Sequence, residues 1–364
     1  MSDVLKMATL VFIASATFSQ SPDYGSERVA YLQTDHFEKP LHVWLPENYE
    51  ITKKWPVMCY YHGTSGEPTI EYMRMYTGGK DWVLIGMTYL KTGQFQHSEE
   101  NLAAERKILD EVLATVSRDV SIDLNRIFVS GFSKGGWVAG LFLQTDTKLA
   151  GGMILGAGTF TEGIAQHPKK IYIGIGETDP NLAMSFRALR EFSANKATEI
   201  THEIWPGIGH RFPLDKIEPS SEPMKQWLRV QAGVADQEEA IGWMEPALTA
   251  IQKNEDKTAF EKLELIQRMK ASPLAKLLDA EGTDALAEVE AKLLSDPKAQ
   301  TEQQAKTAFF KVIAYESRDR YVTTLAECAA QYSKIVTAFP DTEYARQSTV
   351  AMERISQTLG GATK

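Results

Sequence analysis

Ten consecutive residues, 127–136, constrain the fold of this 364-residue chain more than any other stretch. They read Ile-Phe-Val-Ser-Gly-Phe-Ser-Lys-Gly-Gly, an apolar run that predicts a buried strand followed by the start of a helix. Gly131, Ser133 and Gly135 fit the pattern Gly-x-Ser-x-Gly, in which glycine stands on both sides because a Cβ there would collide with the neighbouring strand and helix. The pattern predicts that Ser133 stands in a sharp turn with its hydroxyl exposed at the end of a sheet. The alternative is a glycine-rich turn with an incidental serine.

The apolar runs on either side of this stretch predict an α/β fold, a mostly parallel sheet with helices on both faces. Strands are expected at 28–33, 41–45, 57–61, 82–87, 127–129, 152–156, 170–175 and 199–205, and helices at 99–117, 134–145, 181–194 and 222–231. Strand–helix–strand alternation gives parallel strands, and ligands bind where such strands end. The loops after Tyr61, Val129 and Ile175 follow strand ends, so residues far apart in the sequence are expected to meet there.

The composition changes near Ala235, where Ala, Leu, Glu, Lys and Gln take over and an all-helical domain is predicted. Helices are expected at 237–253, 257–271, 284–295, 301–316, 319–338 and 341–358, separated by turns that contain Pro or Gly. The pair around Pro340 is similar to a tetratricopeptide helix pair, but no second copy is found at a fixed period, so a plain helical bundle is favoured. The predicted domains are therefore residues 24–235 and 236–364, and the helical one is a candidate for binding a protein partner.

Residues 1–20 predict a signal peptide for export. Lys6 precedes the apolar run 7–14, and small residues that suit cleavage follow it. The run is too short to span a bilayer, and no later stretch is apolar for long enough to be a transmembrane segment. A secreted or periplasmic location is expected, and the alternative is an N-terminal tail that is disordered or packed.

Charge and cysteine usage narrow the range of partners. The formal net charge is -9 and there is no basic tract, which argues against nucleic acid or an anionic membrane as the main partner. No Cys/His cluster has metal-ligand spacing, so neither a metal nor a cofactor is expected. Cys59 and Cys328 lie in different predicted domains, and neither has the setting of a nucleophile.

A serine hydroxyl becomes a nucleophile only with a base in hydrogen-bond reach, and the base needs an acid to fix its tautomer. In sheets of this type the order along the chain is serine, acid, histidine. His210 follows the last predicted strand in a glycine-containing loop, and Asp179 follows the strand before it, so both are candidate catalytic residues. Glu177 is the less favoured acid, and Asp215 breaks the order.

The reaction also needs two N–H donors for the oxyanion. The backbone N–H of Lys134 is the first candidate, and that of Thr64, in the loop His-Gly-Thr-Ser-Gly, is the second. Gly63 lets that backbone approach a substrate, and His62 is expected to brace the loop by hydrogen bonding rather than to transfer a proton. The candidates for pocket walls, each of which suits a core position equally well, are Tyr89, Trp205 and Phe212, with the core favoured for Trp205.

These motifs together resemble the α/β-hydrolase superfamily, and within it the small lidless serine esterases of the polyhydroxybutyrate depolymerase, feruloyl esterase and phospholipase/carboxylesterase-like group. The opening residues 41–49, Trp55-Pro56 and Tyr61-His62-Gly63 look like that group, and the match covers residues 28–232. The resemblance implies hydrolysis of a small or polymeric ester through an acyl-enzyme. It leaves the helical domain outside the match.

Two alternatives stay open at this point. A serine peptidase of the prolyl-oligopeptidase type shares the sheet and the catalytic residues, although this chain has no N-terminal propeller. A non-catalytic binding module that uses a hydrolase fold as a support is the other, and a complete Ser, Asp and His set argues against it.

Overall fold

The computed structural model describes residues 10–11, 29–32, 34–89, 99–159, 167–213, 222–318 and 322–361. They form two compact units. The first contains the described residues up to Asn181 together with Ala188–Val234, and the second contains Leu182–Arg187 together with the described residues from Ala235 onward. Of the predicted signal peptide only Leu10–Val11 is described, and the rest of residues 1–20 lies outside the described part of the chain.

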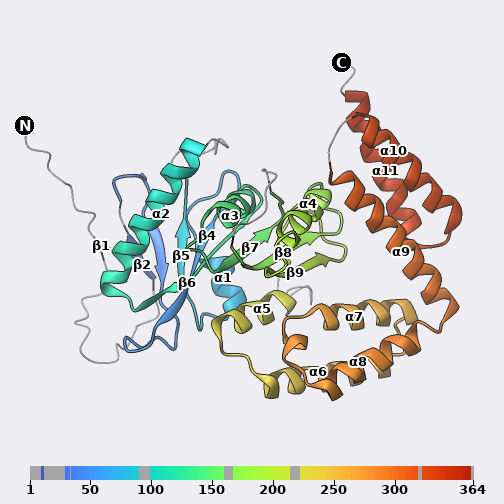
Figure 1. Ribbon diagram of the computed structural model, residues 1–364, viewed down its shortest axis with the longest axis horizontal. Helices are drawn as coiled ribbons and strands as arrows, with labels where there is room; N and C mark the ends of the chain where they lie inside the picture. Colours follow the sequence, from blue (N-terminus) through green and yellow to red (C-terminus); the bar gives the residue numbers. More distant parts are fainter. Residues whose placement is uncertain are drawn as a thin grey trace, which may run out of the picture. The chain divides into compact units, whose positions relative to one another are not determined.

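The first unit is built on one sheet (Figure 1), whose described strands follow the order β1-β2-β3-β5-β4-β6-β7-β8-β9. Their bounds are β1 Leu10–Val11, β2 Val29–Leu32, β3 Leu41–Trp44, β4 Trp55–Tyr61, β5 Val83–Met87, β6 Ile122–Phe132, β7 Gly151–Leu155, β8 Lys170–Gly176 and β9 Glu199–Trp205. The pairs from β1 to β5 along this order are antiparallel, and all pairs from β5 to β9 are parallel. The predicted fold class, a mostly parallel sheet with helices, is confirmed.

Helices cover both faces of this sheet. One core cluster joins the sheet to α2 (Glu99–Asp119), α3 (Lys134–Thr145) and α4 (Leu182–Ser193). A second cluster joins the opposite face to α1 (Glu71–Thr77) and α5 (Glu222–Ala232). In β4, Cys59 and Tyr61 belong to the first cluster whereas Met58 and Tyr60 belong to the second, because alternate residues of a strand point to opposite faces. A central strand of a covered parallel sheet is buried on both sides, which explains its continuous apolar run.

One local prediction for this unit was wrong, and one helix was missed. The strand expected at 127–129, for which residues 123–126 were read from the sequence as the preceding turn, begins earlier: those residues belong to β6, where the pairing with β4 shifts register between Trp55 and Val57. The intervening Pro56 has no backbone N–H to donate, so an irregularity in the ladder is expected beside it. Helix α1 was not predicted, because its seven residues are too few to show a helical period.

The second unit is helical. Its elements are α6 Gln237–Lys253, α7 Ala259–Ala271, the 3-10 helix η2 Leu274–Leu277, α8 Ala280–Leu293, α9 Pro297–Glu316, α10 Val322–Ala338 and α11 Glu343–Gly361. Helix α8 begins four residues before the predicted position, because the Asp279 side chain accepts a hydrogen bond from the N–H of Gly282 and caps the helix there. Helices α10 and α11 pack against each other across the short connection that contains Pro340. None of the described helices combines the length and the apolar composition that a membrane span requires.

Candidate active site

The turn between β6 and α3 holds Ser133 in a backbone conformation that side chains rarely adopt. Ser133 has φ 54° and ψ -117°, and it stands directly before the first residue of α3. A Cβ on Gly131 would lie 2.2 Å from the carbonyl carbon of Gly135, and a Cβ on Gly135 would lie 1.9 Å from the carbonyl oxygen of Tyr61. Only glycine fits either position, so the pair of glycines lets β6 turn into α3 within three residues.

The ends of β8 and β9 bring two further side chains to this turn. His210 Nε2 lies 2.8 Å from Ser133 Oγ, and His210 Nδ1 lies 2.7 Å from Asp179 Oδ2. The other carboxylate oxygen of Asp179 accepts a hydrogen bond of 2.7 Å from the N–H of Asn181. The Asp179 side chain is fully buried, whereas a third of the His210 side chain (33%) is exposed. The three residues therefore form a continuous hydrogen-bonded path from a buried carboxylate to a serine hydroxyl near the surface.

The loops that carry these residues are tied to each other. The N–H of Thr178 donates to the carbonyl of Ile208 (3.0 Å), and the N–H of Gly207 donates to the carboxylate of Glu177 (3.0 Å). Glu177, the less favoured acid in the sequence, therefore bonds to the backbone of the loop that precedes His210, while Asp179 bonds to its ring. Asp215 lies outside the described residues.

The ionisation of the Asp179 carboxyl group depends on its burial and on its hydrogen bonds. Removal from water raises the pKa of Asp179, and the hydrogen bonds from Asn181 and His210 oppose that effect because they favour the charged form. The same two hydrogen bonds fix the orientation of the carboxylate. An ionised Asp179 holds the proton of the imidazole on Nδ1, so Nε2 is left free to accept the proton of Ser133.

A stack of aromatic rings leads from His210 to the surface. The ring of Phe132 lies 5.0 Å from that of His210, the ring of Phe212 stacks on Phe132 at 4.6 Å, and Tyr72 stacks on Phe212 at 4.3 Å. Tyr72 is 39% exposed, and Phe212 is buried. Phe132 and Tyr72 were not singled out in the sequence, because no spacing signal links two rings that lie sixty residues apart. Trp205 is a fully buried core residue of the α1/α5 face, which is the alternative favoured for it from the sequence, so it is not a pocket wall.

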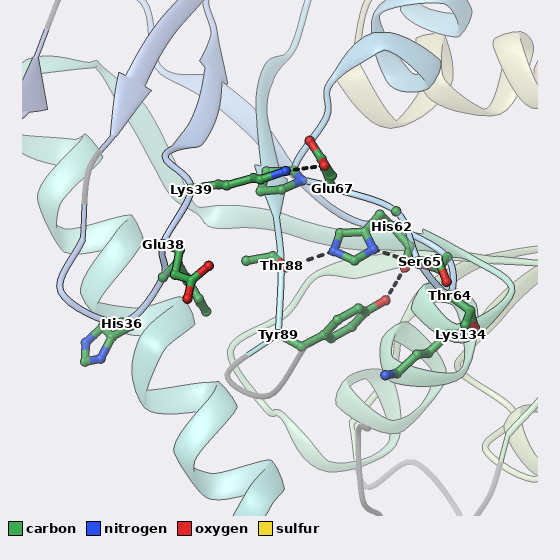
Figure 2. A pocket seen from close by; sticks show the side chains of 14 residues that line it. His36, Glu38, Lys39, His62, Thr64, Ser65, Glu67, Thr88, Tyr89 and Lys134 are labelled. Carbon is green, nitrogen blue, oxygen red and sulfur yellow. Dashed lines mark hydrogen bonds and ion pairs between the residues drawn. The ribbon is translucent and has the colours of Figure 1, made fainter. Parts of the chain in front are cut away.

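His62 braces the loop that follows β4 (Figure 2). Its Nδ1 donates to the carbonyl of Gly63 (2.7 Å), so Nε2 accepts the hydrogen bond from the hydroxyl of Thr88 (2.8 Å). Burial lowers the pKa of His62, which favours this neutral form. A Cβ on Gly63 would lie 3.6 Å from the Cβ of Ser133, so the loop passes directly beside the serine. Thr64, the second candidate for the oxyanion donor, is the next residue along this loop.

A cavity of about 530 Å³ opens beside this loop (Figure 2). Its walls include His62, Gly63, Thr64 and Tyr89, four of the residues singled out in the sequence, together with the side chain of Lys134. The sequence assigned only the backbone N–H of Lys134, although a lysine directly after the serine of the motif was a visible signal. Across the described residues, no group of three or more His, Cys, Asp or Glu side chains has the arrangement of a metal site.

No protein-family model and no curated protein matches the sequence. Among solved structures, esterase 2 of Thermogutta terrifontis is 16% identical with a TM-score of 0.44, covering 57% of this chain and 94% of its own. A ferulic acid esterase of Anaeromyces mucronatus is 16% identical with a TM-score of 0.43, covering 64% and 99%. The Bacillus cereus carboxylesterase is 19% identical with a TM-score of 0.41, covering 52% and 93%.

Sequence identities and TM-scores this low do not indicate function, so the function is inferred from the geometry of the site. The strand order and the sharp turn at Ser133 give the first unit the α/β-hydrolase fold that the sequence resemblance implies.

Proposed function

We propose that this protein is a serine hydrolase that cleaves carboxylic esters, with Ser133 as nucleophile, His210 as general base and acid, and Asp179 as the residue that orients His210. The observation that carries the proposal is the hydrogen-bonded path of 2.8 Å and 2.7 Å that joins the three side chains. Nucleophile, base and orienting acid are each within the reach that acyl transfer requires.

The reaction has two halves. Ser133 Oγ attacks the ester carbonyl carbon while its proton passes to His210 Nε2, which forms a tetrahedral oxyanion. Collapse of this intermediate breaks the bond to the alcohol oxygen, which takes the proton from His210, and leaves the acyl group on Ser133. A water molecule then attacks the acyl-enzyme in the same way, its proton passing through His210 to Ser133, and the acid is released.

Two backbone N–H groups are proposed to bind the oxyanion. Lys134 is the first residue of α3, where backbone N–H groups have no partner inside the helix and the helix dipole is positive. Thr64 N–H is the second donor, because its loop passes beside Ser133 at Gly63. In enzymes of this type one such donor contributes about 2.7–4 kcal/mol to stabilising the transition state.

Hydrolysis of uncharged p-nitrophenyl acetate and butyrate by the full chain tests the proposal. We expect Ser133→Ala to lower kcat by about 10⁶-fold, because the nucleophile is lost while the Cβ and the fold are kept. Folded wild-type protein that releases no p-nitrophenol above the rate of the Ser133→Ala variant contradicts the proposal. A p-nitroanilide substrate in parallel separates an esterase from a peptidase, since only a peptidase cleaves the amide at a comparable rate.

Export is a second, separate proposal that rests on residues 1–20 alone. The measurement is N-terminal sequencing of the protein from the extracellular or periplasmic fraction of expressing cells. A new N-terminus near residues 16–21 supports export with cleavage, whereas an intact Met1 on protein that is confined to the cytoplasm contradicts it.

A further inference from the structure

The side chain of Lys134, the residue that follows Ser133 in the sequence, lies in an unusual environment. Its Nζ is buried from solvent and makes neither a hydrogen bond nor an ion pair with any described residue. What it contacts is the ring of Tyr89, whose centroid lies 4.8 Å away. Contact with an aromatic face offsets only part of the free energy that a buried ammonium loses when it is removed from water. A negatively charged group bound next to Lys134 Nζ would therefore be stabilising.

Other charged residues of the cavity are already satisfied or exposed. Lys39 forms an ion pair with Glu67, and His36 lies 2.8 Å from Glu111. Glu38 is exposed, and Figure 2 shows it well separated from Lys134, on the other side of the Tyr89 ring. Burial lowers the pKa of His62, which favours its neutral form. Within the described walls of the cavity, Lys134 is therefore the cation that has no acidic partner.

One buried carboxylate acts on Lys134 from a distance. The charge of Glu105 favours the protonated amine, while burial lowers the pKa of Lys134. The Nζ of Lys134 has no hydrogen-bond partner among the described residues, so Glu105 acts on it without a direct hydrogen bond. The flexible four-carbon stem of lysine lets the ammonium move from the ring toward a ligand in the cavity that it lines.

We propose that the Lys134 ammonium binds a carboxylate of the substrate, so that the preferred ester carries a negative charge close to the bond that is cleaved. This inference rests on the ester hydrolysis proposed above. The cavity that Lys134 lines lies next to the nucleophile, because a Cβ on Gly63, another of its walls, would lie 3.6 Å from the Cβ of Ser133. A carboxylate bound in it is therefore expected within a few bonds of the ester carbonyl. Half esters of short dicarboxylic acids, or esters of a hydroxy acid, have this chemistry. The N-terminus of α3 adds positive potential at the same place.

Matched pairs of substrates test the inference, with separate arms for the acyl side and the alcohol side. The acyl arm compares mono-p-nitrophenyl succinate with p-nitrophenyl butyrate, and the alcohol arm compares 3-carboxyphenyl butyrate with phenyl butyrate. We expect the wild type to favour the anionic member of one pair in kcat/KM by about 10- to 100-fold, the range for a charge-assisted hydrogen bond. This ratio is measured on the wild type alone, so it stays informative if a variant fails to fold.

Three variants assign the preference to Lys134. Lys134→Gln is expected to bring the ratio close to one, Lys134→Arg to keep most of it, and Lys134→Glu to reverse it. The inference is overturned if neutral esters are hydrolysed but the wild-type ratio is one or less in both arms, or if Lys134→Gln keeps the wild-type ratio. If no ester of either kind is hydrolysed, the proposed function itself is refuted, which is a different result.

Discussion

The backbone strain at Ser133 has a measurable consequence for stability. A residue with a Cβ at φ 54°, ψ -117° costs about 1–3 kcal/mol relative to an unstrained conformation, and glycine avoids that cost. Glycine also gives the unfolded chain more freedom, which costs about 0.5–1 kcal/mol. The Ser133→Gly variant should therefore be more stable than Ser133→Ala by about 1 kcal/mol, and by at most about 2.5 kcal/mol, the difference of the two ranges.

Ser130 provides the matched control. It lies three residues earlier in β6, is fully buried and has no positive φ, so a change from alanine to glycine there removes the same methyl group without relieving strain. Ser130→Gly should be less stable than Ser130→Ala by about 1.3–1.8 kcal/mol, because glycine gives the unfolded chain more freedom (about 0.5–1 kcal/mol) and a buried methyl group is lost (about 0.8 kcal/mol). Ser133 is half-buried and loses less methyl burial than Ser130, so at most about 0.8 kcal/mol of the difference between the two comparisons comes from burial and the rest is the strain.

Urea unfolding followed by tryptophan fluorescence is the assay. Six of the seven tryptophans, all except Trp243, belong to the first unit, so the signal reports mainly the unit that contains Ser133. The midpoint shifts are compared at a common m-value. If glycine destabilises position 133 as much as position 130, the turn holds no strain and the reasoning is refuted.

Three further predictions concern the site and its surroundings. Asp179→Asn should lower kcat by about 10⁴-fold, because the asparagine oxygen keeps the bond from Asn181 and its amide then faces His210 Nδ1, which forces the wrong tautomer. Gly135→Ala should destabilise the first unit in urea by about 3 kcal/mol or more, because its Cβ would lie 1.9 Å from a backbone oxygen. Burial lowers the pKa of His202 to about 4, so unfolding free energy should fall as the pH drops from 6.5 through 4, where only the unfolded chain takes up this proton.

Each of these has its own control. Glu177→Gln keeps an oxygen for the N–H of Gly207 and should change kcat little; a loss as large as that of Asp179→Asn would mean that the acid is misassigned. A Cβ on Gly242, inside α6, would have no atom within 4 Å, so Gly242→Ala should leave stability unchanged or raise it. If Gly242→Ala and Gly135→Ala lowered the unfolding free energy equally, the steric argument would be refuted. A His202→Asn variant should lose part of the acid-dependent drop in stability, and an unchanged drop would contradict the assignment.

The parts of the fold that the sequence predicted well are those with a local cause. The continuous apolar run of β4 and the period of α2 reflect burial, which a pattern of residues records directly. The turn at Ser133 was predictable because the steric need for glycine on both sides leaves a signature of five residues. Helix α1 and the irregular start of β6 were missed, because one is short and the other depends on which strand lies alongside it.

In the candidate site, too, the features with a local or topological cause were predictable, and those that depend on tertiary contacts were not. The order of Ser133, Asp179 and His210 along the chain, and their positions after strands, follow from parallel topology. The contacts of side chains across strands do not: the hydrogen bond from Thr88 to His62, and the stack of Tyr72 on Phe212, join residues whose spacing in sequence carries no signal. The role of the helical unit likewise stays a prediction, since a helical pattern does not specify a partner.

Covalent labelling by a fluorophosphonate probe tests the central claim most directly, because the probe reacts with a serine only when a neighbouring base activates it. The account predicts one adduct per chain, mapped by mass spectrometry to the peptide that contains Ser133, and no adduct in the Ser133→Ala variant. Folded wild-type protein that stays unlabelled, or that carries its adduct on another serine, would contradict the account.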